Sequence, residues 1–273
     1  MRRFLASRDD GVVCLFGAPF DSTTSSRPGA RFGPSAIREA SHGLETFSPM
    51  FRADLSDCSF MDMGDLELPF GDPNPALNMI EEVTRNILAR ERVPYLLGGE
   101  HLLSLGALRA VSHSYPGVRL VHLDAHADLR QTYLGQELSH ATVIWRISEI
   151  IGIDSIRQIG IRSCTREEYP LVEKLSSNTT DIITWAGGAP CYITCDLDIL
   201  DPSVLPGTGT PEPGGFSFQD LLSVLVEIIA HLRIVGIDMV ELAPNLDHSG
   251  VSALVAAKLV RECIIAMNQK ETF

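Results

Sequence analysis

Acidic and histidine side chains gather in three short segments of the sequence: GGEH at residues 98–101, DAHAD at residues 124–128 and DLD at residues 196–198. Each segment follows an apolar run that is typical of a β-strand. Because alternate residues of a strand share one face, the aspartates and histidine of the last two segments start out on one side if the strand geometry persists. Two such clusters at strand ends, together with a separate histidine, predict a metal site.

The predicted ligands are two imidazoles and four carboxylates, namely His101, Asp124, His126, Asp128, Asp196 and Asp198. Carboxylate and imidazole without thiolate suit a fairly hard divalent ion such as Mn²⁺, with ferrous iron, cobalt and zinc as competitors. Four carboxylates balance the charge of two divalent cations, whereas one cation would leave several of them crowded and uncompensated. Paired metals can also make water nucleophilic near neutral pH. We therefore expect two metal ions per chain.

The surrounding sequence alternates between apolar, β-branched runs and amphipathic stretches, which predicts a parallel sheet covered by helices on both faces. The expected strands cover residues 12–16, 95–97, 118–123, 155–161, 191–195 and 234–240. The expected helices cover residues 34–40, 75–90, 101–111, 141–150, 218–231 and 249–267. The residues that lie just after an expected strand include His101, Asp124, Asp196 and Glu241. Ligands bind beyond the carboxyl ends of such strands, so this shared position suits a site built from distant segments.

A single domain over residues 1–273 is expected. No linker, charge block, low-complexity tract or repeat divides the chain, and a boundary between residues 98 and 198 would split the metal site. A chain of this length can bury about three quarters of its unfolded surface. Its hydrophobic content of 45% is enough for a full core.

The net charge of −13 argues against a nucleic-acid partner, because phosphate binding needs a basic surface. It is compatible with a cationic substrate and equally with simple solubility. No charge-free stretch reaches the length of a membrane span, and no signal peptide is visible. The six cysteines show no CxxC spacing, and Cys191 and Cys195 would lie roughly 13 Å apart on one strand, too far for a disulfide. Reduced thiols and a cytoplasmic location are expected.

Longer stretches of the sequence resemble the ureohydrolase family, the arginases and agmatinases. The resemblance rests on GGEHLLSLG, DAHADLR, SHATV and CDLDILDPSVLPGTGTPEPGG, and it covers about residues 17–258. The segments GAPFDSTTSSRPGARFGPSAIREAS and GIDMVELAPNLDHSGVSALVAAKL are closer to agmatinase. The resemblance implies a three-layer α/β/α arginase-like fold with a mostly parallel central sheet of about eight strands. It also implies a binuclear manganese enzyme that hydrolyses a guanidinium group to an amine and urea.

The resemblance further implies roles for individual residues. His140 matches the histidine that shuttles protons near the substrate, and a helix-capping surface histidine is the alternative. Glu241 matches the glutamate that pairs with the guanidinium, whose planar edge fits a carboxylate. Asp128 can accept a hydrogen bond from the nucleophile. The metal ligands divide between the two ions, with His101 and Asp128 on one, His126 and Asp198 on the other, and Asp124 and Asp196 bridging both.

Several neighbouring residues keep two interpretations. His122 either supports the metal ligand Asp124 or is a hydrogen-bonded core histidine. The Pro/Gly-rich residues 206–215 are expected to form a rigid turn that orders the loop after Asp198. Residues that either shape the pocket or make structural ion pairs and loop hydrogen bonds are Arg162, Asp201, Glu212 and His248.

Agmatine is the expected substrate, with putrescine and urea as products, which would place the enzyme in polyamine biosynthesis. Guanidinobutyrate, aminopropylagmatine and arginine share the guanidinium and differ at the far end. Residues 129–139 are the expected specificity loop, and an Arg130 that points into the pocket would bind a carboxylate and favour guanidinobutyrate. A metal-dependent deacylase and a non-catalytic homologue on the same fold are the rivals. The resemblance also implies a homo-oligomer, a trimer or a hexamer.

Overall fold

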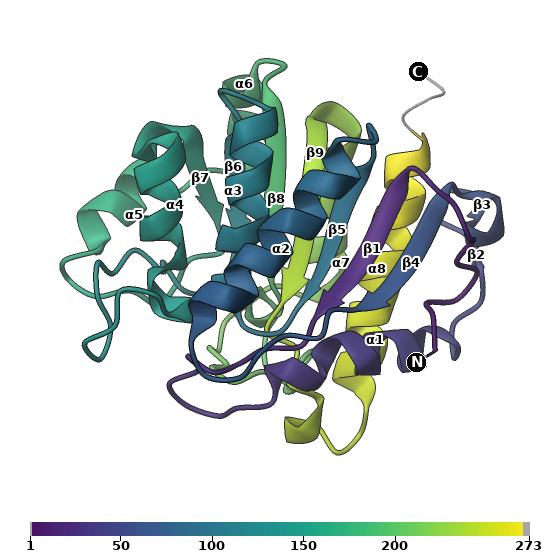
Figure 1. The fold of residues 1–273 in the computed structure, drawn as a ribbon, viewed down its shortest axis with the longest axis horizontal. Helices are drawn as coiled ribbons and strands as arrows, with labels where there is room; N and C mark the ends of the chain where they lie inside the picture. Colours follow the sequence, from purple (N-terminus) through teal and green to yellow (C-terminus); the bar gives the residue numbers. More distant parts are fainter. Residues whose placement is uncertain (1, 270–273) are drawn as a thin grey trace.

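Seven strands form the central sheet of the computed structural model, which describes residues 2–269 (Figure 1). The strand order is β4-β1-β5-β9-β8-β6-β7, and every neighbouring pair is parallel. The strands are β1 (Val13–Ala18), β4 (Phe60–Asp65), β5 (Val93–Gly98), β6 (Arg119–Leu123), β7 (Ile156–Ile159), β8 (Pro190–Asp196) and β9 (Arg233–Val240). The predicted parallel α/β architecture is confirmed, with seven strands in the described sheet where about eight were expected.

Helices cover both faces of this sheet. One face carries α2 (Pro73–Leu88), α3 (Ser104–Ser114), α4 (Val143–Ile151) and α5 (Tyr169–Leu175). The other carries α1 (Gly33–Ser41), α6 (Thr179–Ala186), α7 (Phe218–His231) and α8 (Val251–Gln269). Alternate residues of β1 enter the two hydrophobic cores, with Val13 and Leu15 in one and Cys14 and Phe16 in the other. This alternation produces the three layers.

The helix boundaries follow local capping signals. Before α7, Ser217 and Asp220 form a reciprocal capping box, and the helix has the predicted bounds. Before α2, the Asp72 side chain accepts a hydrogen bond from Asn74 N and Pro73 opens the helix, two residues before the predicted start.

Short 3-10 turns complete the described chain. The site contains η3 (His101–Leu103), η4 (His140–Thr142) and η6 (Leu197–Ile199). The predicted helices over residues 101–111 and 141–150 therefore each begin with a 3-10 turn. The remaining turns are η1 (Ala30–Phe32), η2 (Leu55–Asp57), η5 (Ile153–Ser155) and η7 (Pro244–Leu246), and β2 (Phe47–Ser48) pairs antiparallel with β3 (Ala53–Asp54).

The four adjacent strands β5, β9, β8 and β6 all run in the same direction, so their carboxyl ends meet at one edge of the sheet (Figure 1). They are not consecutive in the chain, and ligands in parallel sheets bind where the strand order reverses in this way. No helix within residues 2–269 is long and apolar enough to cross a membrane.

Candidate metal centre and active site

The structure brings all six predicted metal ligands together at the carboxyl edge of the sheet. Strand β5 leads into His101, β6 leads into Asp124, and β8 ends at Asp196. The remaining ligands lie on the loop after β6 and on η6, and ion-pair distances of 2.9–3.5 Å connect the imidazoles of His101 and His126 with the four carboxylates. Segments that are almost a hundred residues apart in the sequence thus form one cluster.

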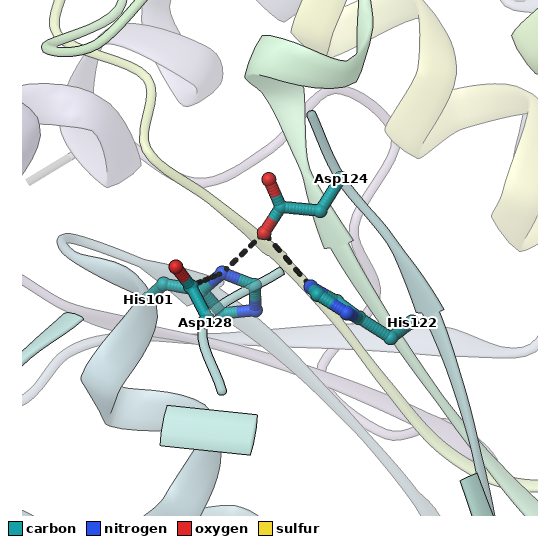
Figure 2. A group of neighbouring side chains, drawn as sticks. All are labelled: His101, His122, Asp124 and Asp128. Carbon is teal, nitrogen blue, oxygen red and sulfur yellow. Dashed lines mark hydrogen bonds and ion pairs between the residues drawn. The ribbon is translucent and has the colours of Figure 1, made fainter. Parts of the chain in front are cut away.

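Three carboxylates surround a single ring nitrogen of His101. Its Nδ1 lies 3.0 Å from Asp124 Oδ2, 3.2 Å from Asp128 Oδ2 and 3.3 Å from Asp196 Oδ2. Figure 2 shows the first two of these carboxylates beside the ring. Within the described chain, this buried nitrogen has no hydrogen-bond partner. One imidazole nitrogen carries at most one proton, so it cannot compensate three carboxylates, and the arrangement fits a cation.

The other ring nitrogen of His101 shows which tautomer is present. Its Nε2 lies 2.9 Å from Thr194 Oγ1, and that hydroxyl donates to Asp238 Oδ1 at 2.7 Å. Tyr192 Oη donates to the other Asp238 oxygen at 2.8 Å. Because the single Thr194 proton goes to Asp238, Thr194 accepts from His101 Nε2–H. With a proton on Nε2, Nδ1 is the nitrogen that a metal would take, and the carboxylate of Asp238 would support this arrangement through Thr194.

A second group of ligands forms around His126. Its Nδ1 lies 2.9 Å from Asp198 Oδ2 and 3.5 Å from Asp124 Oδ1. Asp124 therefore presents one carboxylate oxygen to His101 and the other to His126. This geometry suits the bridging role that was expected for Asp124. Asp196 Oδ2 faces His101, while its Oδ1 accepts a hydrogen bond from Asp198 N at 2.8 Å.

His122 contacts the predicted metal ligand Asp124. Its Nε2 lies 2.8 Å from Asp124 Oδ2, as Figure 2 shows, and its Nδ1 lies 2.9 Å from Gln158 Nε2. Gln158 Nε2 also donates to the carbonyl of Ala127 at 2.9 Å. His122 Nδ1 therefore accepts, and Nε2–H donates to Asp124. The carboxylate of Asp124 is thus oriented by His122, a contact that the interpretation as a supporting residue requires.

The crowding of the carboxylates is visible in their pKa values. Burial, together with the charges of Asp198 and Asp124, raises the pKa of Asp196 well above its ordinary value. Burial and the charge of Asp124 also raise the pKa of Asp198. Burial disfavours a charged imidazole, yet the surrounding carboxylates raise the pKa of His101 well above its ordinary value. Each raised pKa means that the site binds a proton more readily because it lacks positive charge. Two divalent cations would supply that charge.

Two candidate site residues adopt a left-handed backbone, which is rare outside glycine. Asp128 has φ 51° and Glu241 has φ 65°. The carbonyl of Asp128 accepts hydrogen bonds from Ile144 N and Trp145 N at the start of α4, which fixes the reversed backbone. Asp128 therefore reaches the site through a turn, because β6 ends at Leu123 and strand alternation does not continue. Such outliers are often found at functional sites.

Glu241 directly follows β9 and contacts the predicted ligand His101. Its Oε1 accepts a hydrogen bond from His101 N at 2.8 Å, and its own backbone N donates to the carbonyl of Gly99 at 2.9 Å. A Cβ on Gly99 would lie 1.9 Å from the carbonyl oxygen of Phe20, so only glycine fits there. Glu241 is 4% exposed, and burial followed by the charge of Glu100 raises its pKa to about 8. A buried carboxylate of this kind is a suitable partner for a cation.

A cavity of about 260 Å³ opens next to the ligands and is lined by His126, Asp128, His140 and Asp196. Arg130 also lines it. Its guanidinium carbon lies 4.5 Å from the centre of the Tyr133 ring, and its Nε lies 3.9 Å from Glu168 Oε2. The cavity wall therefore carries the Arg130 guanidinium and the buried carboxylate of Glu168 in addition to the predicted ligands. The loop predicted to set specificity does border the pocket.

The loop after Asp198 is ordered by Arg162 and Asp201. Arg162 Nη2 donates to the carbonyls of Asp198 at 2.7 Å and Glu212 at 2.6 Å, and Nη1 donates to Ile199 O at 3.2 Å. Asp201 Oδ2 accepts hydrogen bonds from Gly214 N and Gly215 N. The hydrogen bonds from Ser203, followed by those from this loop, lower the pKa of Asp201. Arg162 and Asp201 thus make the loop hydrogen bonds that were one of the two interpretations, the other being that they shape the pocket.

The polar residues that contact the predicted ligands carry no recognisable signal in the sequence. Thr194 and Gln158 lie on buried strands and read as ordinary core positions until their partners are known. Ser25, whose Oγ lies 2.9 Å from His140 Nε2, belongs to a polar loop far away in the sequence. Glu212 contributes only its backbone carbonyl to Arg162, and His248 is exposed.

Comparison with known proteins gives a consistent result along the chain. The model of the arginase family matches residues 12–266. The agmatinase of Bacillus subtilis is 41% identical over 96% of this chain and 95% of its own. The crystal structure of a putative agmatinase from Clostridium difficile has a TM-score of 0.91 at 41% identity, covering 97% of this chain and 99% of that one. The agmatine ureohydrolase of Thermoplasma volcanium has a TM-score of 0.89 at 32% identity, covering 100% and 97%.

Proposed function

The chain belongs to the arginase family, and we propose that it hydrolyses agmatine to putrescine and urea with two Mn²⁺ ions. The observation that carries the reaction type is the convergence of two imidazoles and four carboxylates beside the buried carboxylate of Glu241. The choice of agmatine is supported by the agmatinases that are about 40% identical to this chain. Manganese is supported by the hard donor set, which contains no thiolate.

The proposed ligands are His101, Asp124, His126, Asp128, Asp196 and Asp198. His101 and Asp128 would hold one ion and His126 and Asp198 the other, with Asp124 and Asp196 shared. Two divalent cations bound there would supply a nucleophilic water at neutral pH. Asp128 would accept a hydrogen bond from that nucleophile.

Glu241 would bind the guanidinium of the substrate. One of its oxygens is held by His101 N, which leaves the other oxygen and the remaining lone pairs for the substrate. A guanidinium offers two N–H groups on one edge, which a carboxylate can accept in parallel. The raised pKa of Glu241 supports this role, because a cationic substrate stabilises the ionised carboxylate where burial alone disfavours it.

His140 would give a proton to the departing amine. It borders the same cavity as His126 and Asp128, and burial lowers its pKa below the ordinary value. A lowered pKa makes the imidazolium a readier acid toward an amine, whose own affinity for protons is much higher. The nitrogen released from the guanidinium then leaves as an uncharged amino group of putrescine, and urea is the second product.

Substrate preference tests this proposal. We expect Mn²⁺-loaded protein to release urea from agmatine with a kcat/KM at least about tenfold higher than from arginine, a gap of about 1.4 kcal/mol. Guanidinobutyrate and aminopropylagmatine belong in the same assay, with Glu241→Ala as the inactive control. Equal or faster turnover of arginine would refute the assignment of agmatine as the substrate. Hydrolysis of acyl-lysine without release of urea would favour the rival assignment as a metal-dependent deacylase. Elemental analysis should give two Mn per active chain.

Assembly into a trimer or hexamer is proposed from the family alone. Light scattering on the full chain at assay concentration should give a mass of three or six times 29.8 kDa. A mass of one chain would refute this assembly and leave the chemistry of the site unaffected.

A further inference from the structure

His140 is held at two points by one short segment near the start of the chain, Thr23 to Ser25. The backbone N of His140 donates to Thr23 Oγ1 at 3.2 Å. The ring Nε2 of His140 lies 2.9 Å from Ser25 Oγ. The main chain and the ring of His140 are therefore both fixed by the same loop, although more than a hundred residues separate them in the sequence.

Glu100 fixes this segment in turn. Its carboxylate is fully buried and accepts three hydrogen bonds, from Thr23 N at 2.9 Å, from Thr23 Oγ1 at 2.7 Å and from Thr24 Oγ1 at 3.3 Å. Glu100 directly precedes His101, so it belongs to the rigid turn after β5 that carries a proposed metal ligand. Burying a carboxylate among neutral donors costs free energy, so Glu100 is a costly choice if its only role is to fill space.

The number of available protons determines which group donates and which accepts in the hydrogen bonds of Thr23. The Thr23 hydroxyl donates its single proton to Glu100, so the Thr23 oxygen is left to accept from His140 N. Ser25 Oγ can accept from His140 Nε2–H while Nδ1 gains or loses a proton. The ring therefore keeps its orientation in both protonation states.

We propose that Glu100, Thr23 and Ser25 are positioning residues that hold His140 in a fixed orientation relative to the metal ligands. This inference rests on the proposed role of His140 as the proton donor. It predicts that the segment contributes to kcat, because it sets the direction of a proton transfer, and that it contributes little to substrate or metal binding.

Paired substitutions separate this role from a general effect on folding. Ser25 is exposed, so Ser25→Ala removes the hydroxyl without opening a cavity, and Ser26→Ala at the next exposed position is the matched control. Thr23→Val removes the hydroxyl at nearly constant volume, and Thr23→Ser restores it. We expect Ser25→Ala and Thr23→Val to lower kcat for agmatine roughly tenfold, with KM and Mn content unchanged. Ser26→Ala and Thr23→Ser should stay close to the unsubstituted protein.

Two further measurements distinguish the failure of this inference from the failure of the proposed function. In a double-mutant cycle, Ser25→Ala should cost nothing more once His140→Asn is present, because both changes remove the same element. An additional loss in that background would overturn the inference. If His140→Asn alone is fully active, the proton-donor role is wrong.

The ring can then still be tested directly. ¹⁵N shifts of His140 should report a fixed tautomer in the unsubstituted protein and averaging between tautomers in Ser25→Ala. Identical ¹⁵N shifts in the two proteins would overturn the inference.

Discussion

His101 and His122 lie side by side, with ring centroids 5.2 Å apart, yet they differ in which nitrogen is free. The Thr194 hydroxyl accepts a hydrogen bond from Nε2–H of His101, and Nδ1 faces three carboxylates. Gln158 donates to Nδ1 of His122, so that Nε2–H points at Asp124. One imidazole is therefore prepared as a ligand and the other as a donor, and the difference comes from a single neighbouring side chain in each case.

Arg130 is expected to influence which substrate tail is accepted. Arg130→Gln removes a positive charge from the cavity wall. At about 6 Å and an effective dielectric constant of about 40, one charge is worth about 1.4 kcal/mol, which is about tenfold. Agmatine should gain about tenfold because its ammonium tail loses a repulsion, and guanidinobutyrate should lose about tenfold because its carboxylate tail loses a partner. The ratio of kcat/KM for agmatine over guanidinobutyrate should therefore rise about a hundredfold.

Two controls belong with this measurement. Arg130→Lys keeps the charge, and Arg166→Gln removes a charge from an exposed residue of the loop between β7 and α5. Both should leave the ratio near its original value. If Arg130→Gln also leaves it unchanged, the contact with Glu168 already neutralises Arg130, and specificity is set elsewhere.

At the scale of elements, the conformation of the loop after β8 depends on the guanidinium of Arg162. Arg162 donates to several carbonyls of this loop, including that of the proposed ligand Asp198. Lysine offers a single ammonium in place of a planar fork, so Arg162→Lys cannot reproduce these bonds. We expect Mn²⁺ affinity to fall about tenfold, as measured by calorimetric titration, with a smaller loss of melting temperature. Arg157→Lys on β7 is the matched control and should bind Mn²⁺ normally.

The central elements of the fold could be predicted from the sequence because their burial leaves a clear pattern. Strands β5, β6, β8 and β9 are nearly continuous apolar runs, as expected for strands covered on both faces. Strand β4, with the sequence FMDMGD, was missed because it pairs only with β1 at the edge and alternates with acidic residues. Helices α5 and α6 were missed because seven or eight residues are too few for a clear period.

The candidate ligands were also predictable, since their residue types and spacing are unusual in themselves. The geometry that brings them together was not. The left-handed turn at Asp128 and the contacts of Thr194, Gln158 and Ser25 depend on segments that meet only in the folded chain. Sequence spacing therefore indicates which side chains bind a metal, whereas tertiary contacts decide how each one is oriented.

At the scale of the whole molecule, metal removal should destabilise the protein more at pH 8 than at pH 6. The raised pKa values of Asp196 and Asp198 mean that the metal-free protein is most stable when these groups are protonated and loses that stability as the pH rises through the raised values. Bound cations remove the repulsion. The melting temperatures of Mn²⁺-loaded and chelated protein should differ by at least about 3 °C more at pH 8 than at pH 6.

Asp196→Asn provides a check on this explanation. It removes one of the crowded charges, so the chelated variant should depend less on pH than the chelated original protein. A gap between loaded and chelated protein that narrows as the pH rises would contradict the assigned cause.

We propose that residues 1–273 form one domain, since the strands that carry the site share a single sheet. That sheet also implies an order of assembly during synthesis. β9 is the last strand to leave the ribosome, yet it lies in the middle, between β4-β1-β5 and β8-β6-β7. Until Arg233–Val240 is available, the half that carries His101 is not joined to the half that carries the aspartates. A chain in which residues 233–240 have not yet been made therefore lacks the strand that joins His101 to the four aspartates, and metal capture would have to wait for β9.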